Sequence, residues 1–399
     1  MAAKKGAGKK RRRWGWKVAL ALVLLLALGL AGLYGASRVV HVRYATAWLR
    51  DLPPAFEGAT ILFVSDLDIR SEADARAAAG MMDALAALQP DVLLLGGDYA
   101  SPGLWESLNG MDMENAAVAA RAASDRYLFF SALSDFPAPL GKYAVLAEED
   151  ALPEQLMQAM AVGGVRLLNG ESVSLTRDGQ ALTLAGIGPD GDLSGLAAGV
   201  RGADCVVAFT HSPARFPAAL TAEAADGGPW ADMILAGGTH GGQMRVGERT
   251  LLPLDEQERR YISGWRKENG VFLLTSQGVG CEGVPLRLGT AAEVHLITLR
   301  RAAQVDAGAD EALLCLIWCV ICNIMHDRPS ENRPVSRAER QEPPFISSGR
   351  LCCRGFGGRG VSREPRGLLA GVGRGRRESP RLREKGAFSY RQCGLRSGR

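Results

Sequence analysis

The hydrophobic pattern of the chain begins with one long uncharged run and continues as a series of short apolar runs. The long run is residues 18–36, VALALVLLLALGLAGLYGA. At about 1.5 Å per residue, a helix of this length spans the roughly 30 Å hydrocarbon core of a bilayer. From residue 58 to residue 300, short runs rich in Val, Ile and Leu alternate with alanine-rich stretches. The pattern therefore predicts a transmembrane anchor followed by a globular domain.

The short apolar runs predict buried β-strands, and the alanine-rich stretches predict helices over 71–90, 114–133 and 154–164. Ser71 is the expected N-cap of the first helix, and Pro90 lies past its end. Apolar strands that alternate with helices are typical of an α/β domain whose sheets are covered on both faces. The predicted strands lie within 59–66, 91–98, 141–150, 180–188, 204–211, 232–240, 270–278 and 293–299.

Charge around the long apolar run predicts its orientation. Residues 1–43 carry ten Lys and Arg and no Asp or Glu, and basic residues stay on the cytoplasmic side of a membrane. Trp14, Trp16 and Tyr34 lie near the two ends of the run, where aromatic rings favour the interface. A cleaved signal peptide is the alternative, although no small-x-small site precedes Ser37. We therefore predict a single-pass protein of the cell membrane, with its main domain on the extracytoplasmic side.

Side chains that can bind metal stand at the ends of five predicted strands. In α/β sheets, ligands bind at the carboxyl ends of the strands. Acidic groups and histidines that converge there need a cation to hold them together. Each residue alone has a simpler explanation, since an Asp after a strand is commonly a turn residue. Five such ends in one chain favour a metal site. The residues are Asp66, Asp68, Asp98, Glu148, Glu149, Asp150, His211 and His240.

The blocks at these strand ends resemble the motifs of the calcineurin-like metallophosphoesterases, and most closely those of their membrane-anchored bacterial branch. That branch has the blocks SDLH, GGD, LGNHD, a late H and GHTHGGQ. The resemblance covers residues 58–300 and includes the ending at 275–299. It implies a sandwich of two mixed β-sheets flanked by helices, with a two-metal centre at the strand ends. The corresponding blocks here are VSDLDI (64–69), LGGDY (95–99), VLAEED (145–150), FTHSP (209–213) and GGTHGGQ (237–243).

Four residues match metal ligands of this family. The resemblance implies that Asp66 and His240 hold the first ion. Asp98 matches the carboxylate that bridges both ions, and His211 matches a ligand of the second. Paired ions of this kind, about 3.5–4 Å apart, generate a hydroxide from water and stabilise charge on phosphate oxygens.

Four other positions depart from the family pattern. Asp68 occupies the position of a histidine in the family, and Glu148 occupies the position of the family's asparagine ligand. Both can still offer oxygen to a metal, so the set favours Mn²⁺ or Mg²⁺ over Zn²⁺. Gly238 replaces the first histidine of GHTH and has no ligand atom, so the second ion is expected to bind more weakly. Glu149 replaces the catalytic histidine and is the candidate that protonates the leaving group.

Two functions are compatible with this pattern. The first is a membrane-anchored phosphoesterase, slow because its site is altered, in which metal-bound hydroxide attacks a phosphomonoester, phosphodiester or pyrophosphate. The anchor makes a lipid-linked substrate an option. The second is a catalytically dead module of the same fold that binds metal or protein. Residues 44–300 carry 18 Lys and Arg against 33 Asp and Glu, which argues against nucleic acid as a partner.

The end of the chain differs in composition from the rest. Residues 301–399 carry 19 basic and 10 acidic side chains and are rich in Arg, Gly, Ser and Pro without periodicity, which predicts disorder or translation of GC-rich DNA out of frame. Cys315, Cys319, Cys322 and His326 lack the second ligand pair of a zinc site. The predicted parts are a basic cytoplasmic segment (1–17), the anchor (18–36), a linker (37–57), the metallophosphoesterase domain (58–300) and an Arg-rich, disordered or artefactual tail (301–399).

Overall fold

The computed structural model of the protein describes residues 5–150, 153–251 and 253–302. The chain divides into two compact units, Met1–Met325 and His326–Arg399, and all described residues belong to the first. The predictions for the Arg-rich tail beyond residue 302, including its cysteines, therefore lie outside the described residues.

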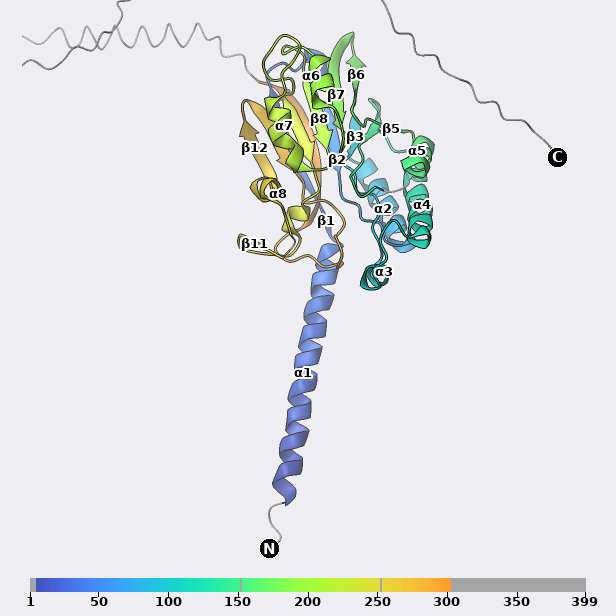
Figure 1. The fold of residues 1–399 in the computed structure, drawn as a ribbon, viewed down its shortest axis with the longest axis vertical. Helices are drawn as coiled ribbons and strands as arrows, with labels where there is room; N and C mark the ends of the chain where they lie inside the picture. Colours follow the sequence, from blue (N-terminus) through green and yellow to red (C-terminus); the bar gives the residue numbers. More distant parts are fainter. Residues whose placement is uncertain (1–4, 151–152, 252, 303–399) are drawn as a thin grey trace, which may run out of the picture. The chain divides into compact units, whose positions relative to one another are not determined.

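The chain begins with one long helix, α1 Lys5–Ser37. Its segment Trp14–Ser37 is 24 residues long and, by length and composition, can span a membrane. The most apolar part of this segment is not buried inside the protein. Two residues, Arg38 and Val39, separate α1 from the first strand, β1 Val40–Leu49. The apolar run predicted from the sequence is thus a continuous helix that leads directly into the globular domain (Figure 1).

The first sheet has six strands in the order β1-β14-β2-β3-β4-β5. β14 is parallel to β1 and antiparallel to β2, whereas β2, β3, β4 and β5 run parallel to one another. Residues 37–57, interpreted from the sequence as a linker, contain β1, because its backbone pairs along its whole length with β14. The strands are β1 Val40–Leu49, β2 Thr60–Val64, β3 Val92–Leu95, β4 Lys142–Ala144, β5 Val165–Leu167 and β14 Ala292–Arg301.

The second sheet also has six strands, in the order β12-β13-β9-β8-β7-β6. Its four central strands are parallel, and the two edge strands β12 and β6 are antiparallel to their neighbours. A short hairpin, β10-β11, stands apart from both sheets. The strands are β6 Glu171–Arg177, β7 Gln180–Ile187, β8 Val206–Thr210, β9 Met233–Ala236, β10 Arg245–Val246, β11 Arg249–Thr250, β12 Gly264–Glu268 and β13 Val271–Thr275.

Three hydrophobic cores hold these sheets and the helices together. Between the sheets, Phe63 and Leu94 of the first pack with Phe209 of the second. Their neighbours along the strands point the opposite way, because side chains alternate across a strand. Leu62 packs against α2, α4 and α5, and Ala208 against α6 and α7. The α/β prediction with two mixed sheets and helices is confirmed (Figure 1).

The helices begin where the sequence offers caps. Ser71 accepts a hydrogen bond from the backbone N–H of Asp74 and so caps α2 as predicted. Asn115 caps α4 in the same way, through Ala117 and Val118. The helices are α2 Glu72–Ala86, α3 Leu104–Leu108, α4 Ala116–Ser131, α5 Pro153–Val162, α6 Leu193–Ala198, α7 Phe216–Thr221 and α8 Glu256–Arg260, with the 3-10 turns η1 Pro54–Phe56, η2 Pro213–Arg215 and η3 His240–Gly242.

Candidate metal centre

The carboxyl ends of five strands lie around one cleft. The segments that follow β2, β3, β4, β8 and β9 all contribute to its wall, and its volume is about 830 Å³. Asp66, which follows β2, lies beneath this wall and is 0% exposed. The topology therefore gathers the side chains that the sequence places at strand ends. The predicted site residues that line the cleft are Asp68, Asp98, Glu148, Glu149, His211 and His240.

Asp66, Asp98 and His240 form the most compact group of donor atoms. One ligand atom from each lies within 4.8 Å of the others. His240 Nε2 is 3.9 Å from both Asp66 Oδ1 and Asp98 Oδ2. These separations are too long for hydrogen bonds. Two ligand atoms that each lie about 2.1 Å from one ion are at most about 4.2 Å apart, so the two distances from His240 fit a shared cation.

Asp68 faces the other ring nitrogen of His240. Asp68 Oδ2 is 3.7 Å from His240 Nδ1, and both atoms are buried without a hydrogen-bond partner. The second carboxylate oxygen of Asp68 accepts a 2.6 Å hydrogen bond from Ser101 Oγ. A carboxylate next to the free nitrogen of a metal-binding histidine orients the ring and raises its basicity. The structure thus places Asp68 beside His240 rather than within the group of three donors.

His211 lies near the same oxygen of Asp66 that His240 approaches. Its Nδ1 lies 3.0 Å from the carbonyl oxygen of Gly96 and 3.8 Å from Asp66 Oδ1. Although burial alone would lower the pKa of His211, the carboxylates of Asp66 and Glu149 raise it. Glu148 and Glu149 are exposed on the cleft wall. Within the described part of the chain, only Asp66, Asp98 and His240 form a group of three donors that fits a metal.

The backbone at the site adopts left-handed conformations, which residues other than glycine rarely adopt. Asp66, Asp68, Asp98 and His240 have φ angles of 54°, 47°, 55° and 49°. Each such residue costs on the order of 1 kcal/mol or more, and persists only where its surroundings fix it. Outliers of this kind cluster at functional sites. Four of them on the residues that share one pocket support a functional role for this edge of the sheets.

Glycines make room for the buried Asp66. A Cβ atom on Gly237 or on Gly278 would lie 2.5 Å from Asp66 Oδ2, closer than such atoms can approach. The carboxylate is held by Ser65 Oγ at 2.6 Å and by the backbone N–H of Gly238 at 2.7 Å. The glycine-rich sequence around His240 therefore allows the second sheet to approach the carboxylate of the first.

Asp150 fixes the loops after β3 and β4 to each other. Its buried carboxylate accepts hydrogen bonds from the backbone N–H groups of Asp98, Tyr99 and Ala147, at 3.1, 3.0 and 2.9 Å. Arg126, which is 0% exposed, contributes positive charge nearby; burial lowers the pKa of its guanidinium and Asp150 partly offsets this. The sequence marks Asp150 only as one of three adjacent acids, so its positioning role was not predicted.

The cleft is strongly acidic. Burial and the carboxylates of Asp68, Asp150 and Asp66 raise the pKa of Asp98 well above its ordinary value. No Lys or Arg is among the described residues of the cleft wall. A bound divalent cation would relieve this crowding of negative charge, and the donor chemistry of the site fits such an ion. The acidic residues of the wall are Asp68, Asp98, Asp112, Glu114, Glu148, Glu149, Glu258 and Glu282.

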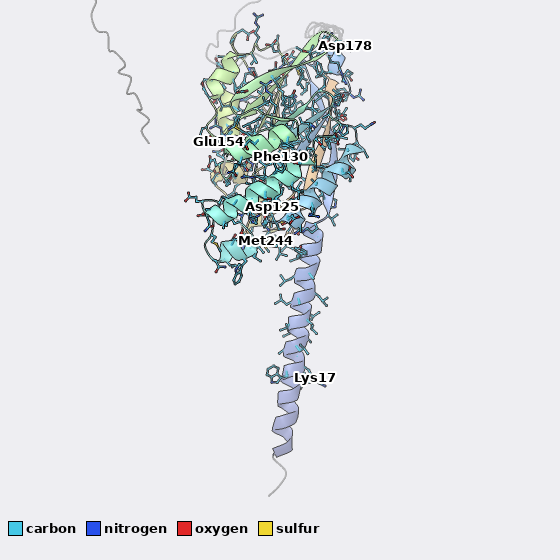
Figure 2. All side chains as sticks on the ribbon, turned by 90° about the vertical axis from the view of Figure 1, so that its right-hand side faces the viewer. Lys17, Asp125, Phe130, Glu154, Asp178 and Met244 are labelled. Carbon is cyan, nitrogen blue, oxygen red and sulfur yellow. The ribbon has the colours of Figure 1, made fainter. Side chains whose placement is uncertain are left out.

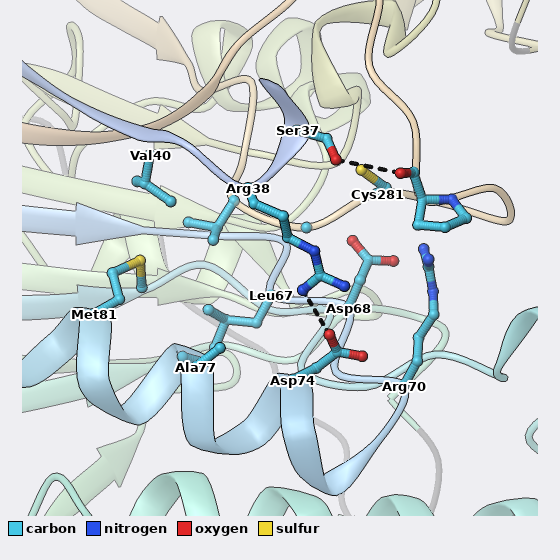
Figure 3. Close-up of a pocket in the computed structure, with 14 residues that line it drawn as sticks. Ser37, Arg38, Val40, Leu67, Asp68, Arg70, Asp74, Ala77, Met81 and Cys281 are labelled. Atoms are coloured by element: carbon cyan, nitrogen blue, oxygen red, sulfur yellow. Dashed lines mark hydrogen bonds and ion pairs between the residues drawn. The ribbon is translucent and has the colours of Figure 1, made fainter. Parts of the chain in front are cut away.

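A smaller cavity of about 130 Å³ shares Asp68 with the cleft. It is lined by the end of α1, by α2 and by the segment 279–285. Figure 3 shows Met81 and Val40 on one side and Arg70 on the other. Arg70 Nε and Nη2 are buried without a hydrogen-bond partner. The cavity therefore joins an apolar wall to an unpaired guanidinium beside the metal centre.

Comparison with known proteins gives two relatives. The chain is 28% identical over 180 residues to an uncharacterised metallophosphoesterase of Aquifex aeolicus (strain VF5), a match that covers 42% of this chain and 64% of that protein. It is 40% identical over 68 residues to the uncharacterised protein YpbG of Bacillus subtilis (strain 168), covering 17% of this chain and 23% of the relative. The match thus spans less than two thirds of the length of either relative. No protein-family model matches the chain.

Proposed function

We propose that the protein is a metal-dependent phosphoesterase anchored in a membrane by α1, with its domain on the extracytoplasmic side. The observation that carries this proposal is the convergence of Asp66, Asp98 and His240 to within 4.8 Å, at a cleft that Asp98 and His240 line. The 28% identical relative, which is named a metallophosphoesterase, supports the same assignment. Membrane anchoring is supported by the length and composition of Trp14–Ser37.

We assign different roles in metal binding and catalysis to the residues of the cleft. Asp66, Asp98 and His240 would hold one divalent ion, and His211 with Glu148 would contribute to a second, weaker site. Asp68, 3.7 Å from His240 Nδ1, would orient the ring by accepting a hydrogen bond from it once a metal is bound. A divalent ion in this cleft supplies a Lewis acid that neutralises charge on a phosphate ester. Mn²⁺ or Mg²⁺ suits the oxygen-rich donors better than Zn²⁺ does.

Glu149 is our candidate for proton transfer to the leaving group. It lies exposed on the wall of the cleft that Asp98 and His211 also line. Its carboxylate therefore has access to a phosphoester bound between them. The substrate class that fits is a phosphomonoester, a phosphodiester or a pyrophosphate, including a lipid-linked one, because the cleft is near the end of the anchor.

The test is metal analysis of the purified full chain, followed by hydrolysis of bis(4-nitrophenyl) phosphate with Mn²⁺. We expect bound metal and slow hydrolysis that EDTA abolishes. Asp98→Asn should remove both, while Asp178→Asn, on the turn between β6 and β7, should change neither. A purified chain that is folded, contains no metal and stays inactive with added Mn²⁺ would contradict the proposal.

The alternative is a catalytically dead module of this fold that binds metal or protein. It is favoured by the eight acidic side chains of the cleft wall, since uncompensated negative charge repels an anionic substrate. The same experiment, extended to 4-nitrophenyl phosphate and inorganic pyrophosphate, separates the two functions. Bound metal without hydrolysis of any of the three phosphate classes would favour the dead module.

A further inference from the structure

The end of α1 is fixed to the globular domain without a flexible connection. Ser37 is 5% exposed, and its Oγ donates a 3.2 Å hydrogen bond to the carbonyl oxygen of Pro285. Arg38 forms a 2.6 Å ion pair with Asp74 at the start of α2. β1 begins at Val40. If α1 spans a bilayer up to its last turn, the domain surface around Ser37 lies at the lipid interface.

The hairpin β10-β11 packs on the same segment that holds Ser37. Gln243 Nε2 donates to the carbonyl oxygens of Glu282 and Val284, both at 2.9 Å, and Arg245 N donates to Leu288 O at 2.7 Å. This region exposes large apolar side chains. Their exposed fractions are 70% for Val246, 75% for Leu251, 44% for Val284 and 37% for Leu288.

Helix α3 exposes a second group of apolar side chains across the cleft. Leu104, Trp105 and Leu108 are 42%, 73% and 71% exposed. Ser107 of α3 lines one wall of the cleft, and Leu254, just after the hairpin, lines another. Figure 1 places α3 and β11 at the end of the domain from which α1 departs, and Figure 2 labels Met244 at that end and Asp178 at the opposite one.

Residues close to these side chains in the sequence line the metal cleft, among them Pro102, Ser107, Pro253 and Gly283. We name the exposed side chains the apolar collar. Exposed apolar groups of this size are unfavourable in water, and a tryptophan prefers a membrane interface. An amphipathic surface next to a spanning helix buries such groups at the level of the lipid headgroups. The apolar collar consists of Leu104, Trp105, Leu108, Val246, Leu251, Val284 and Leu288.

We propose that the apolar collar rests in the interface of the bilayer that α1 spans. The partner is therefore a lipid surface, and the mouth of the cleft opens at the level of the headgroups. The proposal rests on membrane anchoring by α1 but needs no catalytic activity. With activity, it favours a phosphoester whose phosphate is held at the membrane surface.

Photo-crosslinking of the full chain in lipid nanodiscs tests this proposal without any measurement of turnover. Leu108→p-benzoylphenylalanine and Leu251→p-benzoylphenylalanine probe the collar, and Met157→p-benzoylphenylalanine, on α5 and 51% exposed, is the matched control. Leu28→p-benzoylphenylalanine probes α1 itself. Because collar side chains would touch acyl chains, we expect at least about fivefold more lipid adduct at residues 108 and 251 than at residue 157.

Each other outcome overturns the proposal. Lipid adducts at residue 28 with none at 108 and 251 would show that the domain stands away from the bilayer. Equal adducts at 108, 251 and 157 would show non-specific contact. No adduct at residue 28 would show that α1 is outside the bilayer. Both the membrane anchoring and the position of the collar would then be wrong. A phosphoesterase without a collar contact would still hydrolyse soluble bis(4-nitrophenyl) phosphate, so the two proposals fail separately.

Discussion

Asp150 controls the position of Asp98 through the backbone. Asn at this position keeps one acceptor oxygen but loses the other, so at least one of the backbone N–H groups of Asp98, Tyr99 and Ala147 loses its partner. We expect Asp150→Asn to lower the free energy of unfolding by about 1–3 kcal/mol. It should also weaken Mn²⁺ binding, because the loop that carries Asp98 loosens. Chemical unfolding with EDTA and calorimetric titration with Mn²⁺ measure the two effects.

Asp178→Asn is the matched control for this prediction. Asp178 lies in the turn between β6 and β7, with a φ of 51°, and Asn tolerates that conformation as well as Asp does. It should leave both stability and Mn²⁺ affinity unchanged. If Asp150→Asn destabilises the chain but binds Mn²⁺ as tightly as the parent, Asp150 is structural only.

Glu149 offers a direct test of proton transfer. Glu149→His places an imidazole, which titrates near neutral pH, on the wall of the cleft. We expect kcat for a phosphodiester with an alkyl leaving group to rise by about 10- to 100-fold near pH 7, since an alkoxide must be protonated as it leaves and a well-placed general acid contributes this much or more. Glu114→His, exposed on the same cleft wall, should give no gain. Equal kcat in all three proteins would place residue 149 away from the leaving group.

Gly238 is an altered position at which both the backbone and the surrounding space restrict the side chain. Its φ is 81°, and a Cβ atom there would lie 3.3 Å from His211 Nε2. Gly238→His should therefore cost about 1–3 kcal/mol of stability without strengthening Mn²⁺ binding. Gly270→His is the control, because Gly270 has a φ of 85° with open space around it. A stabilised metal complex in Gly238→His, measured by thermal unfolding with Mn²⁺, would contradict this expectation.

At the scale of elements, the pairing of β1 with β14 places the buried carboxylate of Glu293 beside Arg43 and His295. Burial alone would raise the pKa of Glu293, but His295 and Arg43 lower it to about 2 from 4.5. The Arg43 Nε–Glu293 Oε2 distance is 2.9 Å, and the Glu293 side chain is 4% exposed. The folded protein therefore holds this proton more weakly than the unfolded chain, and the stability that Glu293 contributes above pH 4.5 is lost as the pH falls toward 2.

The variant Glu293→Gln should remove this pH dependence. We expect the difference in unfolding free energy between the parent and the variant to shrink by up to about 3 kcal/mol from pH 5 to pH 2. Chemical unfolding at several pH values, with EDTA present, measures it. Glu154→Gln, exposed on α5, controls for the loss of one carboxylate. A difference that stays constant with pH would show that Glu293 is not held in its charged form.

The sequence predicted the buried central strands but not the edges of the sheets. Strands such as β3 and β9 are apolar on both faces, because each is covered on both sides. The edge strands β6 and β12 are largely exposed and read as polar sequence. β1 mixes His41 and Arg43 with apolar residues and is recognisable only through its pairing with β14. Polar edge strands depend on a distant partner that local sequence does not contain.

For the site, strand ends were sufficient to predict which residues meet, but not how they meet. Asp66, Asp98 and His240 converge as expected from the topology. The contact of Asp68 with His240 Nδ1 depends on the left-handed backbone at both residues, which no sequence pattern specifies. Asp150 acts through backbone N–H groups, which a sequence does not reveal. The convergence of these three side chains was thus predictable, whereas the supporting contacts were not.

At the scale of the whole molecule, charge and hydrophobicity are divided along the chain. Residues 1–43 are basic without a single acid, and residues 44–300 are acidic. Basic residues that flank a spanning helix remain on the cytoplasmic side. The acidic domain follows α1 after only Arg38 and Val39. If α1 spans a membrane as proposed, its orientation decides on which side of that membrane the cleft lies.

Replacing the seven Lys and Arg of residues 4–13 by Gln should disturb this orientation. Only Lys17 would then remain before the apolar run, against Arg38 and Arg43 after it, so the basic bias would no longer favour one side. Protease digestion of right-side-out and inside-out vesicles measures on which side of the membrane the domain lies. We expect the parent domain to be cut only from the extracytoplasmic side and the variant from both. Arg201→Gln with Arg249→Gln, far from the helix in sequence, should keep the parent pattern because distant charges contribute little to topology. A parent domain cut only from the cytoplasmic side would contradict the orientation and would place the substrate in the cytoplasm.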